Sequence, residues 1–262
     1  MQTMEPNGVI PIRLLEGDPT ARWLKAAYAD LRRSPGVSLS YGLALSLLSW
    51  IVTLAIIADE RWFLLLPLLG GFMFLAPLIA VGLYEASRRH EAGLPVTIVD
   101  ALSAVRRNAG QIALMGLVLA LFFLAWTRIA LLLFALFFGS APPPVADLFG
   151  AIFLTTDNLA FVLLSNAVGL VLAAVVFAIS AISIPMLLDR DVDVVTAIAT
   201  SVRACRANWQ IMIGWAALIV LIIGLGAITF YVGLAVAYPL IGHATWAAYR
   251  ELVPRGPLDP AG

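Results

Sequence analysis

His243 has the side chain with the most chemical potential, because it is the one histidine within an apolar segment. A buried imidazole can relay a proton, ligate haem or contact a quinone. The only other histidine, His90, lies in a charged stretch, so a bis-histidine haem site cannot form. A hydrogen bond to a neighbouring helix is the simpler role. His243 is therefore a weak candidate for cofactor binding, and we predict no bound cofactor.

Two further charged groups have structural interpretations that compete with functional ones. Arg128 follows Ile112 in an apolar run, about 24 Å along a helix, so it reaches the far interface and can extend its charge to water. The DRDVD run, residues 189–193, resembles a cation site but lacks the glycine and distal glutamate of a calcium loop. We predict that it ends one helix, that Asp193 caps the next, and that no metal site exists here.

Three prolines, Pro77, Pro185 and Pro239, each fall late in a segment long enough to cross a membrane. A proline inside a helix removes a donor and clashes with the preceding turn, which produces a kink. The alternative is a hinge or an opened backbone at a substrate site, as in transporters with discontinuous helices. Such broken helices lie near the midplane, whereas these prolines lie nearer one end, so we predict kinks.

The sequence lacks the patterns that usually accompany catalysis. It contains no phosphate-binding glycine loop, no metal-spaced set of cysteines and histidines, and no nucleophile elbow. We therefore predict that the protein is not an enzyme.

The composition indicates that the elements which position these residues lie in a membrane. Hydrophobic residues make up 62% of the chain and charged residues 12%, against about 45–50% and about 25% in ordinary soluble domains. The single cysteine, Cys205, excludes an intramolecular disulfide. Residues 1–36 lack the apolar core of a cleavable signal peptide.

A short amphipathic pattern occurs three times. In residues 96–111, VTIVDALSAVRRNAGQ, apolar side chains recur at helical spacing at Ile98, Leu102 and Val105. The segment is too short and too charged to span a bilayer, and it fits a helix that lies in the membrane interface. Offsets of −74 and +100 give the matching faces Leu24, Tyr28, Leu31, Pro35 and Ile198, Val202, Cys205, Trp209.

Each copy has recognisable start signals and precedes apolar sequence long enough for two spans. Thr97 and Asp100 form a capping-box pattern, and Asp18 precedes a proline that suits the first helical position. The alternative to a repeat is that any helix before a span ends in arginine and a small polar residue. The predicted divisions are a mobile leader (1–19), one membrane domain (20–252) with repeats at 20–84, 96–188 and 194–250, and a disordered tail (253–262).

The predicted fold is an all-α membrane protein with six transmembrane helices, arranged as three hairpins that each follow an interfacial amphipathic helix. With six spans, both termini share one side of the membrane. That side holds every one of the 16 lysines and arginines except Arg61 and Arg128. Because basic residues accumulate in the cytoplasm, the sequence predicts a bacterial inner-membrane protein with cytoplasmic termini.

Three segments carry a resemblance to a known family. They are residues 74–89 (FLAPLIAVGLYEASRR), residues 184–205 (IPMLLDRDVDVVTAIATSVRAC) and the run GHATW-x-x-YR at residues 242–250. Together they resemble a family of predicted proteobacterial integral membrane proteins of unknown function, from the first span to Leu252. The resemblance implies an inner-membrane protein with about six spans, and it implies no activity.

These observations leave three functional hypotheses. The first is a non-catalytic membrane protein that contacts lipid or assists a membrane complex, because basic interfacial helices attract anionic headgroups. Its predicted headgroup contacts are Arg32, Arg33, Arg106, Arg107, Arg203 and Arg206. The second is a small-solute transporter or channel with a polar path that includes Ser38, Ser40, Ser165, Asn166, Ser180, Ser183, Thr229, Tyr231 and His243. The third is a haem- or quinone-binding accessory subunit. The sequence gives no indication of a nucleic-acid partner.

Overall fold

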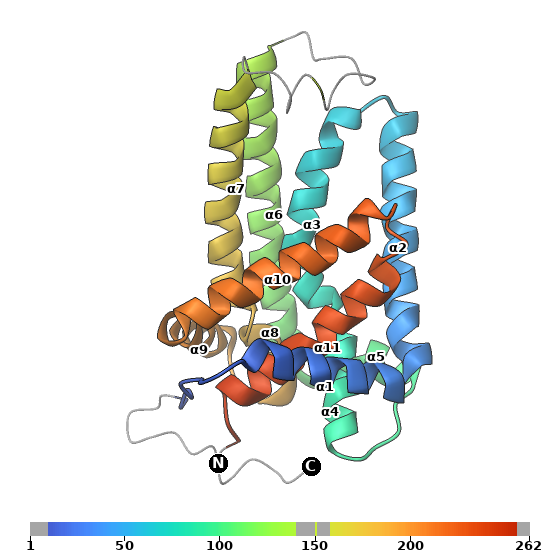
Figure 1. The fold of residues 1–262 in the computed structure, drawn as a ribbon, viewed down its shortest axis with the longest axis vertical. Coiled ribbons are helices and arrows are strands. Elements are labelled where there is room, and N and C mark those ends of the chain that lie inside the picture. Colours follow the sequence, from blue (N-terminus) through green and yellow to red (C-terminus); the bar gives the residue numbers. More distant parts are fainter. Residues whose placement is uncertain (1–9, 140–149, 151–157, 256–262) are drawn as a thin grey trace. The chain divides into compact units, whose positions relative to one another are not determined.

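The computed structural model describes residues 10–139, 150 and 158–255, and the regular elements of this part are helices (Figure 1). The elements are α1 (Pro19–Arg33), α2 (Pro35–Ala58), η1 (Trp62–Leu64), α3 (Leu65–Ile79), α4 (Val81–Glu91), α5 (Ile98–Ser103), η2 (Ala104–Asn108), α6 (Ala109–Phe138), α7 (Leu159–Ser180), α8 (Ser183–Asp189), α9 (Val194–Ala207), α10 (Trp209–Ile228) and α11 (Leu234–Leu252). The all-helical class predicted from the composition is confirmed for the described residues.

Among the described residues, five helical stretches are long and apolar enough to cross a membrane. They are Pro35–Ala58, Pro67–Glu91, Ile98–Phe138, Leu159–Asp189 and Trp209–Ile228. The shortest has 20 residues, which corresponds to about 30 Å of helix, the thickness of the hydrocarbon core. α11, the sixth predicted span, is not among the five because its second half carries polar and charged side chains, including His243, Arg250 and Glu251. The sixth span stays a prediction.

The chain forms two compact units. Unit 1 comprises Met1–Trp50, Pro77–Met115 and Ala178–Gly262, and unit 2 comprises Ile51–Ala76 and Gly116–Phe177. The boundaries fall inside long helices, so that α2, α3, α6 and α7 each contribute to both units. The predicted repeats follow the order of the chain, whereas the units collect segments from more than one repeat.

In unit 1, short helices pack around the ends of longer ones. α1 lies against α11, and α11 also packs on α4, α8 and α10 (Figure 1). α5 packs on α4, and α9 packs on α8. The Trp23 and Trp215 rings meet edge to face with centroids 5.3 Å apart, and both side chains are buried. Unit 1 therefore has its own core.

The three predicted interfacial segments begin at the expected residues. Thr97 and Asp100 form the predicted capping box. The Asp18 side chain accepts from the Ala21 amide, and Asp193 accepts from the amide of Thr196. The second segment is not one helix, because six residues of α-helix are followed by the 3₁₀ turn η2 before α6 starts.

Small side chains form the inner face of these three segments. Ala27, Ala101, Ala104, Ala197 and Ala204 are all buried. A methyl side chain lets two helix backbones approach closely, so these alanines set the packing against unit 1. The larger apolar residues of the predicted faces lie elsewhere on the helices.

The three prolines predicted to kink helices have different surroundings. Pro77 lies inside α3, and the helix is interrupted at Ala80. Pro185 lies in the first turn of α8, after an interruption at residues 181–182, where a missing amide costs little. Pro239 lies inside the continuous helix α11. Regular helix is thus interrupted close to two of the three prolines.

One serine compensates for the break between α7 and α8. The Ser201 hydroxyl, from α9, accepts from the Ile182 amide at 3.2 Å and donates to the Ala178 carbonyl at 2.7 Å. Both backbone groups lie where the regular helix ladder is interrupted, and a buried unpaired backbone group would be costly. The break is therefore satisfied by a side chain from the following helix.

Unit 2 is held mainly by aromatic and small residues. The Trp126 indole donates to the Pro67 carbonyl at 2.7 Å, and the same ring lies against Gly70, Gly71 and Gly169. Five phenylalanines cluster nearby in contacting pairs: Phe63, Phe134, Phe137, Phe138 and Phe161. The absence of side chains at the glycines makes room for the tryptophan ring.

Part of the predicted mobile leader is tied to unit 1. The Arg13 amide donates to the Leu252 carbonyl at 2.9 Å, and the Ile10 side chain is buried. The predicted tail is also engaged at its start, since Val253 is buried and the Pro254 carbonyl accepts from Arg190. Residues 1–9 and 256–262 lie outside the described residues.

Candidate functional site

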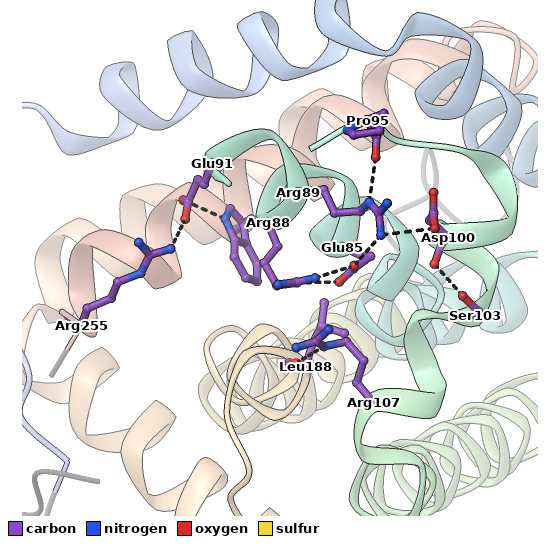
Figure 2. A network of polar contacts seen from close by, with 11 residues as sticks. Glu85, Arg88, Arg89, Glu91, Pro95, Asp100, Ser103, Arg107, Leu188 and Arg255 are labelled. Carbon is purple, nitrogen blue, oxygen red and sulfur yellow. Dashed lines mark hydrogen bonds and ion pairs between the residues drawn. The ribbon is translucent and has the colours of Figure 1, made fainter. Parts of the chain in front are cut away.

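The densest group of charged side chains in unit 1 lies where α4, α8 and α11 meet (Figure 2). Glu85 is at its centre, with a carboxylate that is 5% exposed. It accepts two hydrogen bonds from Arg88, from Nε at 2.7 Å and from Nη2 at 2.8 Å. The two residues are three apart on α4, so a single helix surface supplies both partners. Bidentate pairing compensates for the burial of the carboxylate.

Arg89 extends this group towards α5. It lies 3.2 Å from Asp100 and 3.9 Å from Glu85, and its Nε donates to the Pro95 carbonyl at 2.8 Å (Figure 2). Asp100 also completes the capping box of α5, whose N-cap is Thr97. One guanidinium therefore fixes the connection between α4 and α5 at both ends.

Glu91 connects α4 to α11 and to the residues that follow it. Its carboxylate accepts from the Trp246 indole at 3.0 Å and from Arg255 at 3.1 Å (Figure 2). Arg250 approaches it at 3.2 Å and donates to Asp189 at 3.0 Å. Arg250 thereby joins α4 and α8 through α11, and the three helix ends are held by charge-assisted bonds.

The acidic run at the end of α8 performs the structural role predicted for it. Asp189 accepts from the Tyr249 hydroxyl at 2.7 Å as well as from Arg250. Asp193 caps α9, and hydrogen bonds from the Thr196 hydroxyl and amide lower the pKa of its carboxyl. Over the described part of the chain, no group of three histidine, cysteine or acidic side chains could hold a metal ion.

His243 is fully buried between two serines of unit 1. Its Nε2 lies 2.9 Å from the Ser38 hydroxyl, and its Nδ1 lies 2.7 Å from the Ser87 hydroxyl. Both ring nitrogens are therefore in use, and the ring joins α11 to α2 and α4. A haem iron or quinone at this position would have to displace a serine and open the packing around a side chain with no exposed surface.

The sequence indicated one of these two serines but not the other. Ser38 was named as a polar residue of a possible path with His243, and the two are in contact. Ser87 was missed because it lies 156 residues from His243. Its position one residue from the RRH run made it look like part of a charged loop, although it is buried.

The other hydroxyls and amides of the predicted polar path mainly bond to their own helices. The Ser40, Asn166, Ser183 and Thr229 side chains donate to carbonyls three or four residues earlier. Such back-bonding satisfies the polar group within the helix. These four side chains are therefore satisfied by nearby backbone carbonyls.

The arginines predicted to contact headgroups divide into two kinds. Arg32, Arg33, Arg106, Arg107 and Arg206 are exposed. Arg203 differs, because it is half-buried and donates to the Ile10 carbonyl at 2.9 Å.

The exposed members make few contacts with the rest of the chain. Arg32 lies over the Tyr28 ring at 5.6 Å. Arg107 donates to the Leu188 carbonyl at 3.3 Å through Nε (Figure 2). The ends of the three interfacial segments thus present exposed guanidinium groups.

The apolar face predicted for the second segment is also exposed, whereas the faces of the other two segments are exposed only in part. In the second copy, Ile98, Leu102 and Val105 are 43%, 64% and 41% exposed. Trp209, at the end of the third predicted face, is 59% exposed. These apolar side chains are available for contact outside unit 1.

Two remaining residues of the sequence analysis have simple surroundings. Arg128 lies on α6 and is exposed. Cys205, on α9, is largely buried, and burial raises the pKa of its thiol to about 12. A thiol with so high a pKa is protonated at neutral pH and is a poor nucleophile.

Comparison with known families agrees with the apolar helices. A family model described as "Predicted integral membrane protein (DUF2189)" matches residues 65–189, just under half of the chain. Five candidate spans lie among the described residues. The protein is a multi-pass integral membrane protein.

The matched stretch runs from α3 to α8 and includes Glu85, Arg88 and Asp189 of the charged group. It does not include the GHATW run at residues 242–250, the third segment of the resemblance. Searches of curated proteins and of solved structures gave no match.

Proposed function

We propose that this membrane protein is non-catalytic and that its three interfacial segments bind the anionic lipid surface of the cytoplasmic leaflet. The observation that carries the proposal is that exposed arginines lie at the ends of all three segments, together with an apolar face that is exposed in the second segment and partly exposed in the other two. An amphipathic helix with this distribution lies in the interface, with its apolar side chains among the acyl chains and its cations at the phosphates.

The direct connection of each segment to a candidate span supports its position in the membrane interface. η2 ends at Asn108 and α6 starts at Ala109, while α9 ends at Ala207 and α10 starts at Trp209. α1 ends one residue before α2. A helix joined without a loop to a membrane span is held at the membrane surface.

The charges at these ends favour anionic over neutral lipid. Each basic side chain close to an anionic surface contributes about 1 kcal/mol of binding. The five exposed arginines are Arg32, Arg33, Arg106, Arg107 and Arg206. The proposal leaves out Arg203 because its guanidinium is bonded to the Ile10 carbonyl.

The proposal includes the finer topology derived from the sequence. We place the protein in a bacterial inner membrane with six spans, α11 being the sixth, so that both termini and all three interfacial segments face the cytoplasm. The distribution of lysine and arginine supports this orientation. The recurrence of segment, span and span supports an internal repeat.

A test compares lipid retained by purified variants. The chain is reconstituted in nanodiscs of mixed phosphatidylglycerol and phosphatidylcholine, released in the mass spectrometer, and its bound lipids are counted. Replacement of the five exposed arginines by glutamine is expected to reduce bound phosphatidylglycerol several-fold. Bound phosphatidylcholine should not change, because only the electrostatic contribution is removed.

The matched control replaces Arg61 and Arg128, the two basic residues assigned to the opposite side. This control should retain phosphatidylglycerol as the parent does. Equal loss of both lipids from the five-residue variant, or equal loss of phosphatidylglycerol from the control, would contradict the proposal.

A further inference from the structure

Each of the three predicted interfacial helices packs on another helix of unit 1. α5 packs on α4, α9 packs on α8, and α1 packs on α11. The first two pairs are neighbours in the chain, connected by residues 92–97 and 190–193. The third pair joins the first helix of the chain to the last. The three pairs therefore follow one another in a cycle that the chain itself does not close.

Contacts with Glu251 make the third connection between α1 and α11. The Glu251 carboxylate accepts from Arg22 at 2.6 Å and from the Trp23 indole at 2.7 Å. Trp23 is buried, and its ring packs on Trp215 of α10. α1 thus depends on side-chain contacts where α5 and α9 have a short covalent connection.

The residues in front of α1 continue this attachment. The Asn208 side chain accepts from the Leu15 amide at 2.9 Å and donates to the Arg13 carbonyl at 3.1 Å. Arg203 donates to the Ile10 carbonyl at 2.9 Å. Residues 10–15 are therefore bound along the junction of α9 and α10.

The second interfacial segment has a similar contact at the equivalent asparagine. The Asn108 amide donates to the Val192 carbonyl at 3.1 Å, and Gln111 accepts from the Val194 amide at 2.9 Å. Residues 192–194 lead into α9, just as residues 13–15 lead into α1. Each asparagine binds the segment in front of the next interfacial helix in the cycle.

From these contacts we infer that residues 10–33, the leader together with α1, form a strap that closes a ring of three helix pairs. Of the three helix pairs, the pair of α1 with α11 is the one without a short covalent connection. Opening of the strap requires loss of the contacts with Glu251, Asn208 and the Trp215 ring and leaves the chain otherwise connected. None of these contacts involves Arg32 or Arg33, the arginines of α1 that are proposed to bind lipid.

The strap is expected to open more readily than the two helices with short connections. When a tethered helix separates, the tether keeps it close and favours its return. The strap is joined through Ser34 to α2 but has no short connection to α11, the helix on which it packs, so local opening away from α11 should have a lower free energy. Backbone amides of α1 should therefore exchange with solvent faster than those of α9.

Hydrogen–deuterium exchange of the full chain in nanodiscs tests this inference. In the parent, peptides from α1 should exchange faster than peptides from α9. Replacement of Glu251 by alanine removes a charge-assisted bond to each of Arg22 and Trp23. It should accelerate exchange in α1 about tenfold, because the pair with the exposed Arg22 contributes little and the bond from the buried indole contributes about 1.5 kcal/mol. Exchange in α5 and α9 should not change.

Two variants serve as controls for this experiment. Glu251→Gln retains acceptor oxygen for the indole and should exchange more slowly in α1 than Glu251→Ala. Asp193→Ala removes the cap of α9 and should accelerate exchange at the start of α9 without effect on α1. Equal acceleration of α1, α4 and α11 by Glu251→Ala, or no acceleration at all, would overturn the inference.

A circular permutant tests the strap without weakening any contact. Gly262 is joined to Met1, and the new ends are placed at Gly93, between α4 and α5. The Arg13 amide already lies 2.9 Å from the Leu252 carbonyl, so the sixteen residues 256–262 and 1–9 can connect the two ends. Slow exchange should move to α1, and fast exchange should move to α5. An unchanged order of exchange would overturn the inference.

Discussion

Units 1 and 2 are stabilised by different kinds of contact. In unit 1, buried and half-buried charges pair within α4, as Glu85 with Arg88, and between α8 and α11, as Asp189 with Arg250. In unit 2, the Trp126 ring lies against glycines, and phenylalanines form a cluster. The ion pair of unit 2 that the structure gives, Arg61 with Asp59, is exposed.

The two kinds of contact suit two environments, a membrane surface and the interior of the lipid. Where the chain turns at a membrane surface, helix ends leave backbone groups and charges that must find partners, and unit 1 supplies them from neighbouring helices. Where helices run inside lipid, burial of apolar surface provides no net gain, so close packing of aromatic and small residues holds them together. Variants that remove one kind of contact should therefore weaken one unit.

The largest effect should come from the buried ion pair of unit 1. Glu85→Ala leaves the Arg88 guanidinium half-buried without its bidentate partner. Breaking a buried pair on one side costs about 3 kcal/mol or more, so the midpoint of thermal unfolding in detergent should fall by many degrees. Asp59→Ala, which removes the exposed pair of unit 2, should cost less than about 1 kcal/mol. Similar losses in the two variants would remove the contrast between the units.

The next effect concerns two adjacent glycines of unit 2. A methyl group at Gly71 would lie 2.8 Å from the Phe123 ring and 2.9 Å from Trp126, whereas one at Gly70 would lie 3.5 Å from Trp126. Gly71→Ala should destabilise the protein by about 1–3 kcal/mol through overpacking. Gly70→Ala, the matched control on the same helix, should have little effect. Denaturation in mixed detergent measures both, and equal effects would contradict the close packing of Trp126.

A smaller effect is expected from the single polar contact of Trp126. Trp126→Phe removes the donor to the Pro67 carbonyl and retains an aromatic ring in the packed site. The expected loss is about 1 kcal/mol, measured in the same unfolding assay. Trp209→Phe is the control, because Trp209 is largely exposed and should tolerate the change. A loss above that of Gly71→Ala would show that unit 2 depends on polar contacts more than packing.

The smallest effect at neutral pH concerns Cys205, a thiol of unit 1 without a charged partner. Burial raises its pKa from 9.0 to about 12. The neutral thiol therefore contributes stability that is fully present below pH 9 and is lost as the pH rises towards 12. Maleimide labelling at pH 8 should be about a thousand times slower in the folded protein than after unfolding in dodecyl sulfate, since thiolate is the reactive form. Equal labelling rates would contradict burial of the thiol.

Local patterns in the sequence predicted much of the fold. The capping box at Thr97 and the cap at Asp193 were predicted from neighbouring residues, and both are confirmed. The apolar composition predicted the membrane class, which the matched family and the five candidate spans support. These features depend on residues close together in the chain or on composition, so periodicity and spacing suffice to find them.

Contacts between distant residues could not be predicted in the same way. Ser87 and His243 are 156 residues apart, and Leu15 and Asn208 are 193 apart. A serine in a polar-looking stretch and an asparagine at a helix end have many possible partners, and no local rule selects one. The division of the second interfacial segment into α5 and η2 was also missed, because the apolar spacing of Ile98 and Leu102 fits a continuous helix.

All three interfacial segments are proposed to lie on one face of the membrane. Single cysteines at Lys25, Arg106 and Arg206, in a Cys205→Ser background, can be labelled with an impermeant maleimide in inverted and right-side-out vesicles. Glu60→Cys, in the turn after α2, marks the opposite face. We expect the three interfacial cysteines to react only in inverted vesicles and Glu60→Cys only in right-side-out vesicles. Labelling of any interfacial cysteine from the same side as Glu60→Cys would contradict the proposed topology.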